Sequence, residues 1–492
     1  MLIREKLVIN TAELGNKLPK LIALFRYSNP AYYQKQMMKI TTAGIEPTLY
    51  HYALEDGPGG KQLFLPRGGI EKVRAFFKEN NLPLRILDQR VTNPTLIDFT
   101  LRGISKKTGL PFILSDKQEH IIEELISNEG GLIQAMPGFG KSLTMLGLIS
   151  RVKQPTLILM HEHRLRSQWE AEIKDKIDGS FTLGRLDGDK KEDGDVVVGL
   201  FQTATKLIGE DPEWFNKFGM VITDEVQHSS SETFNKLITN IPAKYRIGVS
   251  GTIKRSDGLE LLIFDTFGRI IVDIPENQAK ERIVGFEPLM FYTGIDFNLP
   301  IRYTYQNGKR DTAYDHTKTL NVLTENEERN ALIIKNVIKD IEEGHYPLII
   351  SDRVEHCEKL YETLTDIGYK GILLISKTRK KVKWEVVKED NTIQFISAIG
   401  KIASEGLDLP RLSSIHLTCP TTNESQIRQK IARVRRYMEG KPLPKVWDYV
   451  DNGAFYWRKD SSGEKVKNFT LKRKGDARRL FYKRILEEYA EA

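Results

Sequence analysis

The sequence predicts an α/β protein in which two parallel-sheet domains follow each other behind a small N-terminal α+β domain. From about Pro111, short apolar runs typical of buried strands alternate with amphipathic helical stretches, and a second such series begins near Pro347. This alternation indicates parallel sheets with helices on both faces. The 492 residues suffice for two or three domains that each bury a core. We expect domains at residues 1–110, 111–280 and 281–452, followed by a basic tail at 453–492.

The N-terminal segment holds no catalytic constellation, and apolar residues at helical spacing predict one short helix within residues 69–80. The expected strands of the first parallel sheet are residues 131–135, 156–160, 196–200, 220–223 and 246–250. Those of the second sheet are residues 348–351, 371–375, 393–396, 414–417 and 446–450. Between the two series, residues 301–305 alternate and then meet Asn307-Gly308, which predicts a hairpin with a type I′ turn. We interpret it as an ordinary surface hairpin.

Composition excludes several classes of protein. The hydrophobic fraction of 40% and charged fraction of 28% are those of a globular chain. Cys357 and Cys419 are too few for a disulfide framework or a cysteine-based zinc site. No apolar run approaches the roughly 20 residues that span a bilayer, and the N-terminus lacks the apolar core of a signal peptide. We expect a cytosolic protein without membrane contact.

Charge is concentrated near the C-terminus. The whole chain carries +8, and the nine cations between Lys465 and Arg484, opposed only by Asp476, also sum to +8. The cations are Lys465, Lys467, Lys472, Arg473, Lys474, Arg478, Arg479, Lys483 and Arg484. A basic segment on a neutral body indicates either a polyanion contact or a solvated terminal helix.

The segment Ala135–Ser142 has the pattern of a phosphate-binding P-loop between a strand and a helix. Gly138 and Gly140 allow backbone N–H groups to converge on phosphate oxygens, and the helix N-terminus adds partial positive charge. Lys141 can reach the β- and γ-phosphates, and Ser142 can ligate Mg²⁺. Ala135 stands where the general pattern has its first glycine. The segment predicts a nucleotide site.

Two adjacent acids follow the expected strand at 220–223. Asp224 can hold Mg²⁺ through water, and Glu225 can orient and deprotonate the water that attacks the γ-phosphate. Because this pair lies downstream of a P-loop and at the end of a buried strand, it predicts hydrolysis rather than nucleotide binding alone.

The set of motifs between Phe112 and Val450 resembles the superfamily 2 helicases. Asp224–Gln227 occupies the position of the DExH-type motif, with His228 one position beyond the usual histidine. Gln118 falls where the family has an adenine-reading glutamine, and Ser250–Thr252 is similar to the Ser-Ala-Thr motif that couples hydrolysis to strand movement. The resemblance implies two RecA-like motor domains that use ATP and Mg²⁺.

In the second domain, Ser404–Pro410 is similar to motif V, and the resemblance assigns Gly406 and Asp408 to the nucleotide. Gln429–Arg436 resembles motif VI. The resemblance implies that Arg433 and Arg436 contact the γ-phosphate across the domain cleft. Guanidinium groups there stabilise charge that develops during phosphoryl transfer.

Positions that contact nucleic acid depart further from the family pattern. His161-Glu162 stands where many relatives have Pro-Thr in motif Ia, and Ile399 stands where motif V often begins with Ser or Thr. A third departure, outside these contact positions, is Ala432 in place of the motif VI glycine. The candidate contact and coupling residues are Arg164, Arg166, Gln202, Thr203, Ser250, Thr252, Lys254, Arg255, Arg353, Lys377, Arg379, Lys380, Lys381, Lys383 and Gln429. Contacts of this kind to phosphates predict binding that tolerates any sequence and weakens with salt.

Within the superfamily, Asp224–His228 and Ser404–Pro410 resemble the XPB/UvsW-like group, which includes bacteriophage branch-migration helicases. The resemblance implies a DNA helicase that reshapes forks, displacement loops and four-way junctions in recombination, repair or replication, alongside other proteins of those processes. The N-terminal domain would then recognise branched DNA or brace the motor. One chain contains both halves of the ATP site, so we expect a monomer.

Other interpretations remain open at this point. The motor could act on RNA, or could translocate on duplex DNA for a restriction system, although no nuclease constellation accompanies it. A nucleotide-switched clamp would bind DNA without moving, but it would not need the arginines of motif VI. A non-catalytic α/β protein would require the motifs to occur in this order by accident.

Overall fold

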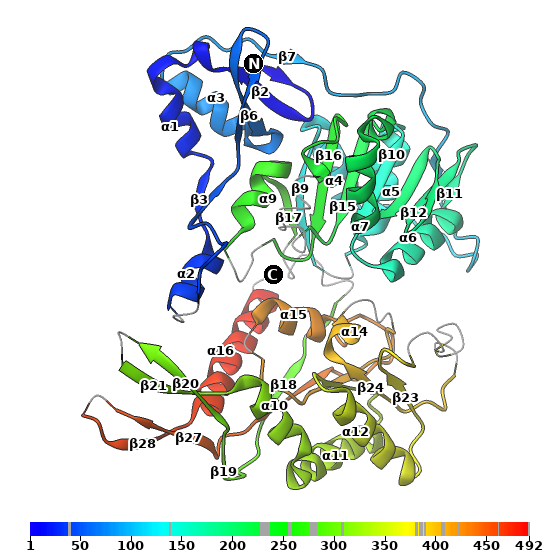
Figure 1. Ribbon diagram of the computed structural model, residues 1–492. Coiled ribbons are helices and arrows are strands. Elements are labelled where there is room, and N and C mark those ends of the chain that lie inside the picture. Colours follow the sequence, from blue (N-terminus) through cyan, green and yellow to red (C-terminus); the bar gives the residue numbers. More distant parts are fainter. Residues whose placement is uncertain are drawn as a thin grey trace. The chain divides into compact units, whose positions relative to one another are not determined.

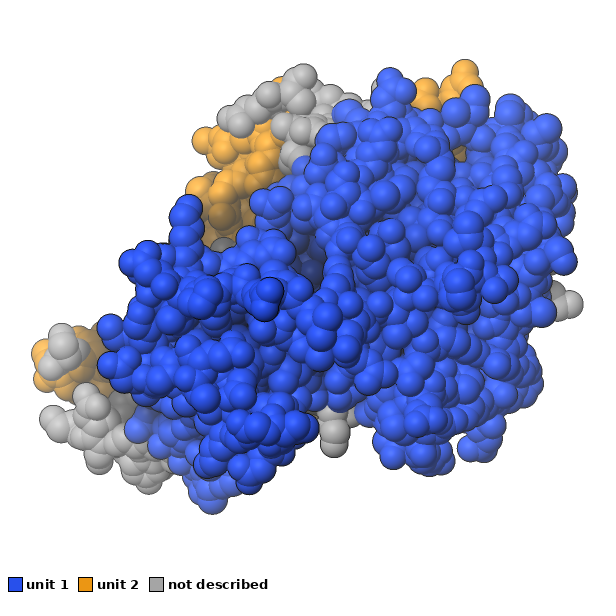
Figure 2. Space-filling model, turned by 90° about the horizontal axis from the view of Figure 1, so that it is seen from above, with its two compact units in different colours: residues 1–36, 41–274 blue, residues 37–40, 275–492 orange. Residues whose placement is uncertain are grey.

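The computed structural model contains two compact units, which are described separately (Figures 1 and 2). Unit 1 comprises residues 1–36 and 41–274, and unit 2 comprises residues 37–40 and 275–492. The structure describes residues 1–37, 41–136, 139–226, 237–253, 258–274, 283–306, 309–378, 382, 387, 390–404, 409–421, 423–460 and 462–490. The predicted N-terminal domain and first motor domain thus belong to one unit.

The N-terminal domain is built on a five-stranded sheet in the order β5-β6-β2-β1-β7. Its strands are β1 Leu2–Ile3, β2 Lys6–Asn10, β5 Ala53–Gly57, β6 Gly60–Pro66 and β7 Leu87–Asp88. The helices are α1 Leu18–Ala23, α2 Pro30–Met37 and α3 Ile70–Glu79, and the short strands β3 Arg26–Ser28 and β4 Thr48–Tyr50 pair with each other. The helix predicted within 69–80 is confirmed, because α3 buries Val73, Phe76 and Phe77 against this sheet.

The main sheet of unit 1 has eight strands in the order β13-β12-β14-β10-β15-β16-β9-β17, all parallel to their neighbours except β13. The strands are β9 Gly130–Ala135, β10 Thr156–Met160, β12 Leu183–Asp187, β13 Lys190–Glu192, β14 Val196–Leu200, β15 Met220–Asp224, β16 Tyr245–Ser250 and β17 Ile270–Ile274. A small antiparallel pair joins β8 Thr100–Leu101 to β11 Ile177–Asp178. The five predicted strands are confirmed, with bounds within one residue.

Alternate residues of these strands enter two separate cores, because successive side chains of a strand point to opposite faces. Helices α4 Asp116–Ser127, α5 Lys141–Val152 and α6 His163–Lys176 pack on the face of Ile133 and Ile158. Helices α7 Phe201–Glu210 and α9 Glu260–Phe267 pack on the face of Leu132 and Leu159. The predicted three-layer arrangement is therefore present.

Unit 2 contains a six-stranded parallel sheet in the order β18-β26-β25-β22-β24-β23. Its strands are β18 Glu287–Tyr292, β22 Pro347–Ser351, β23 Gly371–Leu374, β24 Phe395–Ile399, β25 Ser414–Leu417 and β26 Lys445–Val450. Its helices are α10 His316–Glu325, α11 Glu327–Glu342, α12 Val354–Asp366, α14 Gly400–Ser404, α15 Glu424–Ala432 and α16 Thr470–Ala490. The sequence missed β18, and β24 begins two residues later than predicted because Asp390 holds Thr392 in a turn.

Two hairpins lie side by side at one edge of unit 2 (Figure 1). The predicted hairpin is confirmed as β20 Ile301–Gln306 and β21 Lys309–Tyr314, although its turn residues lie outside the described part of the chain. The second hairpin, β27 Ala454–Lys459 and β28 Lys465–Asn468, pairs with β19 Phe297–Asn298. The rings of Tyr314 and Tyr456 lie 6.3 Å apart and join the two hairpins.

The prediction of a separate basic tail after residue 452 is wrong. Helix α16 buries Phe481, Tyr482 and Ile485 in the core of unit 2. Arg478 is only 3% exposed and forms two hydrogen bonds with Asp448, of 2.6 and 2.7 Å. The high density of cations on the other faces of α16 hides this apolar face in the sequence. Arg478 therefore stabilises the core of unit 2 and is not available to bind a polyanion.

A buried carboxylate joins the N-terminal domain to the first motor domain. Asp265 of α9 has no exposed side-chain surface, and it accepts hydrogen bonds from the Tyr27 hydroxyl at 2.6 Å and the Lys72 ammonium at 2.7 Å. The Nδ1 atom of His51 lies 2.9 Å from the same carboxylate. Burial and the charge of Asp265 raise the pKa of Tyr27, so this hydroxyl remains protonated and donates. Three side chains of the N-terminal domain thus converge on one group of the motor.

Two buried arginines strengthen this junction from both sides. Arg67 of the N-terminal domain donates to the carbonyl oxygens of Ala243 and Lys244 at 2.6 and 3.2 Å. Arg246 of the motor domain donates to the carbonyl oxygen of Glu5 at 3.1 Å. At Gly68, an added Cβ would lie 2.3 Å from the backbone nitrogen of Gly268, so only glycine permits this close approach. The N-terminal domain is therefore fixed to the motor domain.

We predict that Asp265→Ala lowers the free energy of unfolding of unit 1 by about 3 kcal/mol, because it leaves buried donors without their acceptor. Part of the Lys72 side chain reaches solvent, which holds the loss at the lower end of the usual range for broken buried pairs. Urea denaturation followed by circular dichroism measures the change. Asp56→Ala, which removes an exposed acid of the same domain, should change stability by less than about 0.5 kcal/mol. Equal effects of both substitutions would contradict the role of Asp265.

Candidate active site

Three of the predicted motifs meet at one edge of the unit 1 sheet. Strands β15, β16 and β9 are neighbours and parallel, and their carboxyl ends lead to Asp224, to Ser250 and to the P-loop. The register pairs Asp224 with Val249 and Ser250 with Gln134. The carboxyl edge of a parallel sheet is the usual position of a ligand site in such folds.

The P-loop leads into α5, whose first residue is Lys141. Gly140 caps this helix with φ +91°, a left-handed conformation that favours glycine. The Lys141 ammonium donates to the carbonyl oxygen of Ala135 at 3.2 Å and so folds back over the loop. Ser142, the second residue of α5, is partly exposed. Gly138 lies outside the described residues, and its predicted role remains a prediction.

The buried carboxylate of Asp224 lies beside this loop. It is 9% exposed and accepts hydrogen bonds from the indole of Trp169 at 2.9 Å and from the backbone of Glu225 at 3.0 Å. Burial raises the pKa of Asp224, and the charge of Glu225 raises it further, whereas Lys141 and the Trp169 hydrogen bond oppose the rise. The three charged side chains are therefore near enough to interact electrostatically.

The residues present fit a magnesium ion with phosphate ligands. A hydroxyl and a carboxylate are the hard oxygen donors that Mg²⁺ prefers, and Mg²⁺ commonly takes one or two carboxylates together with substrate phosphates. Ser142 and Asp224 provide this set. A cation would also offset the unfavourable burial of Asp224 and the repulsion between its charge and that of Glu225.

Glu225 has an uncommon backbone conformation for a residue with a side chain. Its φ is +55°, one of four positive values at non-glycine residues in the described chain. Such conformations cost free energy and persist where the surrounding structure requires them, often at functional sites. Here the turn separates two adjacent acids, so that Asp224 is buried while Glu225 remains partly exposed.

Gln118 braces the P-loop. Its side chain has no exposed surface, its amide donates to the carbonyl oxygens of Phe139 and Gly140 at 3.3 and 3.4 Å, and its oxygen accepts from the backbone of Ser115 at 3.0 Å. Ser115 and Gln118 also form a capping box at the start of α4. A role of Gln118 in reading adenine stays a prediction.

Gln134 connects the Ser250–Thr252 motif to the P-loop strand. Its side-chain oxygen accepts from the backbone of Ile253 at 3.0 Å, and its amide donates to Asp273 at 3.0 Å. The Ser250 hydroxyl is buried and bonds the backbone of Thr252 in both directions, at 2.5 and 3.0 Å. Ser250 and Thr252 thus form a fixed turn that suits coupling rather than direct strand contact.

Sequence reasoning missed both Gln134 and Trp169. The polar residue Gln134 inside an otherwise apolar strand could have indicated a side-chain hydrogen bond at this position. Trp169 follows Leu165 and precedes Ile173 at intervals of four, which places it on the buried side of α6. Its hydrogen bond with Asp224, 55 positions along the chain, could be identified only from the three-dimensional structure.

The structure corrects one predicted nucleic-acid contact in unit 1. Arg166 is 7% exposed and forms ion pairs with Glu170 and with Asp187, so it is not available to a phosphate backbone. Arg164 on the same helix is partly exposed. Gln202 is exposed on α7, while the hydroxyl of the neighbouring Thr203 accepts from the backbone of Gly188 at 3.0 Å.

Several predicted residues of unit 2 can be placed within that unit. Arg353 lies before α12 and donates to Asn321 at 2.8 Å and to the carbonyl oxygen of Thr317 at 3.1 Å. Gln429 is partly buried on α15, and Lys377 is exposed after β23. The predicted residues outside the described part of the chain are Lys254, Arg255, Arg379, Lys380, Lys381, Lys383, Gly406 and Asp408.

The arginines that follow α15 differ in their environments. Arg435 is 3% exposed, donates to the carbonyl oxygen of Val284 at 2.8 Å, and lies 5.2 Å above the rings of both Phe286 and Tyr489. Arg433 and Arg436 remain partly exposed, and burial lowers the pKa of Arg436. The predicted pair is thus distinct from Arg435, which stabilises the fold.

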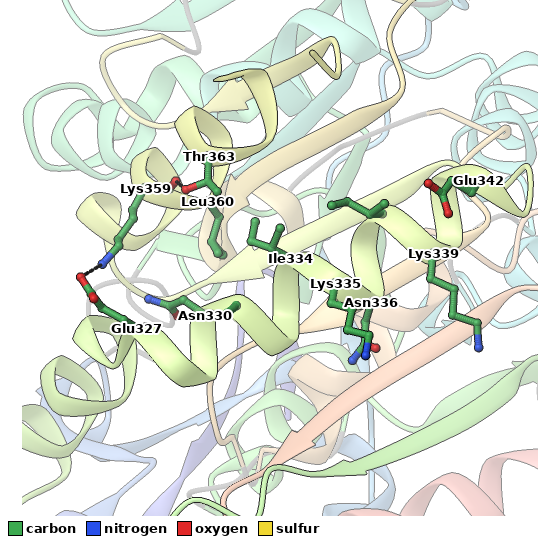
Figure 3. A pocket seen from close by; sticks show the side chains of 12 residues that line it. Glu327, Asn330, Ile334, Lys335, Asn336, Lys339, Glu342, Lys359, Leu360 and Thr363 are labelled. Atoms are coloured by element: carbon green, nitrogen blue, oxygen red, sulfur yellow. Dashed lines mark hydrogen bonds and ion pairs between the residues drawn. The ribbon is translucent and has the colours of Figure 1, made fainter. Parts of the chain in front are cut away.

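Two cavities of unit 2 differ in whether the predicted site residues line them. One of about 630 Å³ lies between α11 and α12, with Ile334 and Leu360 among its lining residues, and it contains none of the predicted site residues (Figure 3). Lys359 forms an ion pair with Glu327 across its end, at 3.7 Å. The second, of about 660 Å³, is lined by Arg353 and His356 among others.

Comparison with known proteins identifies the family. The family model described as "Type III restriction enzyme, res subunit" matches residues 112–255, and "Helicase conserved C-terminal domain" matches residues 328–438. "Probable helicase D10" of Escherichia phage T5 is 30% identical over 328 residues, which cover 66% of this chain and 68% of that protein. The chain belongs to the superfamily 2 helicases. It is therefore an ATP-dependent helicase with two RecA-like domains.

The chain is also similar to a second phage helicase and to a solved structure. "ATP-dependent DNA helicase uvsW" of Enterobacteria phage T4 is 23% identical over 291 residues, covering 58% of this chain and 54% of that protein. The solved structure titled "ATP-dependent Type ISP restriction-modification enzyme LlaBIII bound to DNA" matches with a TM-score of 0.52 and 12% identity, over 85% of this chain and 33% of that one. The latter similarity concerns the fold alone. Among the described residues, no helix is both long and apolar enough to cross a membrane.

We predict that Glu225→Gln slows ATP hydrolysis by about 10²–10⁴-fold, the usual effect of removing a general base. The amide has the same shape but cannot accept the proton of the attacking water. ATP binding, measured with a fluorescent analogue, should stay close to that of the native protein. Loss of ATP binding with normal turnover of the nucleotide that binds would contradict this role.

We predict that Trp169→Phe moves the acid limb of the ATPase pH profile to higher pH. The substitution removes a hydrogen bond that stabilises the Asp224 carboxylate, so the pKa of Asp224, already raised by burial, rises further. As the pH falls, Asp224 is protonated earlier and loses its affinity for Mg²⁺, whereas the rates should converge at high pH.

The measurement is steady-state turnover across pH at a fixed, subsaturating Mg²⁺ concentration. Trp214→Phe is the matched control, because Trp214 lies in unit 1 and packs against Phe215 and Phe218 away from Asp224. Identical acid limbs for Trp169→Phe and the native protein would show that this hydrogen bond does not tune Asp224.

Proposed function

We propose that this helicase uses ATP hydrolysis to remodel branched DNA, including forks, displacement loops and four-way junctions. The observation that carries the ATP chemistry is the cluster of Lys141, Asp224 and Glu225 at the carboxyl edge of the unit 1 sheet. The similarity to a DNA helicase of phage T4 supports DNA as the substrate. Because two of the relatives are phage proteins, we place its action in the cytoplasm of an infected host.

In the proposed reaction, the N–H groups of Gly138 and Gly140 hold the phosphates of ATP, and Lys141 neutralises their charge. Ser142 and Asp224 would hold Mg²⁺, and the bound ion would offset negative charge on the phosphates. Glu225 accepts the proton of the attacking water. We assign Arg433 and Arg436 to the charge that develops on the γ-phosphate, and Gly406 and Asp408 to nucleotide contacts.

The action on branched DNA is supported by the attachment of the N-terminal domain to the motor. Asp265, which holds that domain, lies in α9, the helix that follows the Ser250–Thr252 turn in the chain. A displacement of this turn during the ATP cycle would be transmitted to a rigidly attached domain. We propose that the N-terminal domain contacts the junction, while Arg164, Gln202, Thr203, Lys254, Arg255, Arg353 and Gln429 contact the strands along which the motor moves.

The test is conversion of labelled synthetic four-way junctions, forks and tailed duplexes, with ATP and Mg²⁺, resolved on a native gel. Glu225→Gln is the inactive control. We expect junctions and forks to be converted faster than plain tailed duplex. Conversion of tailed duplex alone would retain the helicase but contradict branched-DNA remodelling.

A second candidate function is translocation on duplex DNA without strand separation. The match of residues 112–255 to a family named for a restriction enzyme favours it. Displacement of a triplex-forming strand from duplex DNA, without conversion of any junction, would support this alternative. ATPase activity stimulated by RNA and not by DNA would instead identify an RNA motor.

A further inference from the structure

One face of the β27–β28 hairpin combines an exposed aromatic ring with lysines. The ladder places Trp457 opposite Lys467, and Lys459 opposite Lys465. Because side chains two apart on a strand share a face, all four project from the same side. Trp457 is 41% exposed, and the three lysines are exposed. We call these four residues the hairpin face.

The hairpin face rests on a rigid support. On the opposite side of the hairpin, Tyr456 is buried in a small core with Leu299, Leu323 and Leu471. At the turn, the Asp460 carboxylate accepts from the backbone N–H groups of Ser462 and Glu464, each at 2.9 Å. The backbone that carries these side chains is therefore ordered before any ligand arrives, which lowers the entropic cost of binding.

The charge of the hairpin face favours an anionic ligand. It contains three lysines and no acid, and Lys459 and Lys465 stand directly opposite each other, where like charges repel. Among the residues that the structure describes, these two lysines form no ion pair. Lys467 lies 4.0 Å above the ring of Phe455 and 5.9 Å from that of Trp457, which holds its charge beside the indole. An anion on this face would relieve the repulsion.

The indole specifies which polyanion fits. An exposed aromatic ring next to cations can stack on a base while the cations contact the adjacent phosphates. In a duplex the bases are already stacked on each other and offer their edges, not their faces. A single strand presents unstacked bases and a flexible phosphate backbone, so it satisfies both parts of the hairpin face.

We propose that the hairpin face binds single-stranded DNA, with a base stacked on Trp457 and phosphates on Lys459, Lys465 and Lys467. The choice of DNA rests on the proposed function; the geometry itself specifies a single strand. A polyanion contact was one of the two interpretations of the segment 465–484, and the proposal assigns this contact to one exposed hairpin. The rest of that segment includes Arg478 in the core, Lys474 bonded to Tyr314, and Arg484 paired with Glu424 at 2.5 Å.

The first experiment measures binding of a fluorescent oligothymidylate to the full-length protein without nucleotide, by anisotropy across a range of salt concentrations. Each phosphate contact on a single strand contributes about 0.7 to the slope of log K against log salt. Lys459→Gln combined with Lys465→Gln should therefore lower the slope by about 1.4. An unchanged slope overturns the proposal.

The matched control is Lys335→Gln combined with Lys339→Gln, which removes the same charge from exposed positions of α11 in the same unit. It should leave the slope unchanged. If the control lowers the slope as much as the hairpin variant, the effect comes from net charge alone, and the hairpin face is not a site.

The second experiment uses the stacking residue. Trp457→Ala should weaken oligothymidylate binding by about 5- to 150-fold, the range that corresponds to one stacked base. Trp457→Phe should restore much of this loss, and binding of a duplex of equal length should change little. Equal losses for single strand and duplex would contradict stacking, as would a Trp457→Phe variant that behaves like Trp457→Ala.

These results separate the inference from the proposed function. If single-stranded DNA stimulates ATP hydrolysis and both hairpin variants bind it as the native protein does, only the hairpin inference fails. If the native protein binds no single-stranded DNA and no DNA stimulates its ATPase, the proposed action on DNA fails as well.

Discussion

The burial of Asp224 beside Glu225 and Lys141 is the constraint on which the catalytic part of the structure depends. A carboxylate that is only 9% exposed is unfavourable, and the neighbouring Glu225 makes it more so. The Trp169 indole and the Lys141 ammonium offset part of this cost. A bound magnesium ion would supply the positive charge that this site still lacks.

The same sheet edge explains how the site can communicate with the rest of unit 1. Gln134 accepts a hydrogen bond from the backbone after the Ser250–Thr252 turn, and Gln118 donates to the backbone of the P-loop, so neither motif can shift without changing a side-chain hydrogen bond. The next helix along the chain, α9, carries Asp265 and with it the N-terminal domain. The sheet edge and the N-terminal domain are thus both attached to the part of the chain that contains the Ser250–Thr252 turn and α9.

Local patterns predicted most of the fold, because buried strands, a P-loop and acids after a strand are recognisable within a few residues. Prediction failed where partners are distant in sequence. The cations of α16 concealed the apolar face that carries Phe481 and Ile485, Arg166 looked like a surface cation until its pairing with Asp187 was visible, and the contact of Trp169 with Asp224 links two separate elements. Of the predicted ATP-site residues, Lys141, Asp224 and Glu225 lie near one another, while the roles of Arg433 and Arg436 remain predictions.

The most direct test of the account is the rate of MgATP hydrolysis by Lys141→Ala, compared with the native protein at saturating DNA. The positive charge of Lys141 acts on Asp224, and its ammonium donates to the carbonyl oxygen of Ala135 at the start of the phosphate loop. If the site works as described, turnover is abolished while the protein keeps its native circular dichroism spectrum. Near-normal turnover by a folded Lys141→Ala protein would mean that ATP is hydrolysed elsewhere, and would contradict the assignment of this sheet edge as the active site.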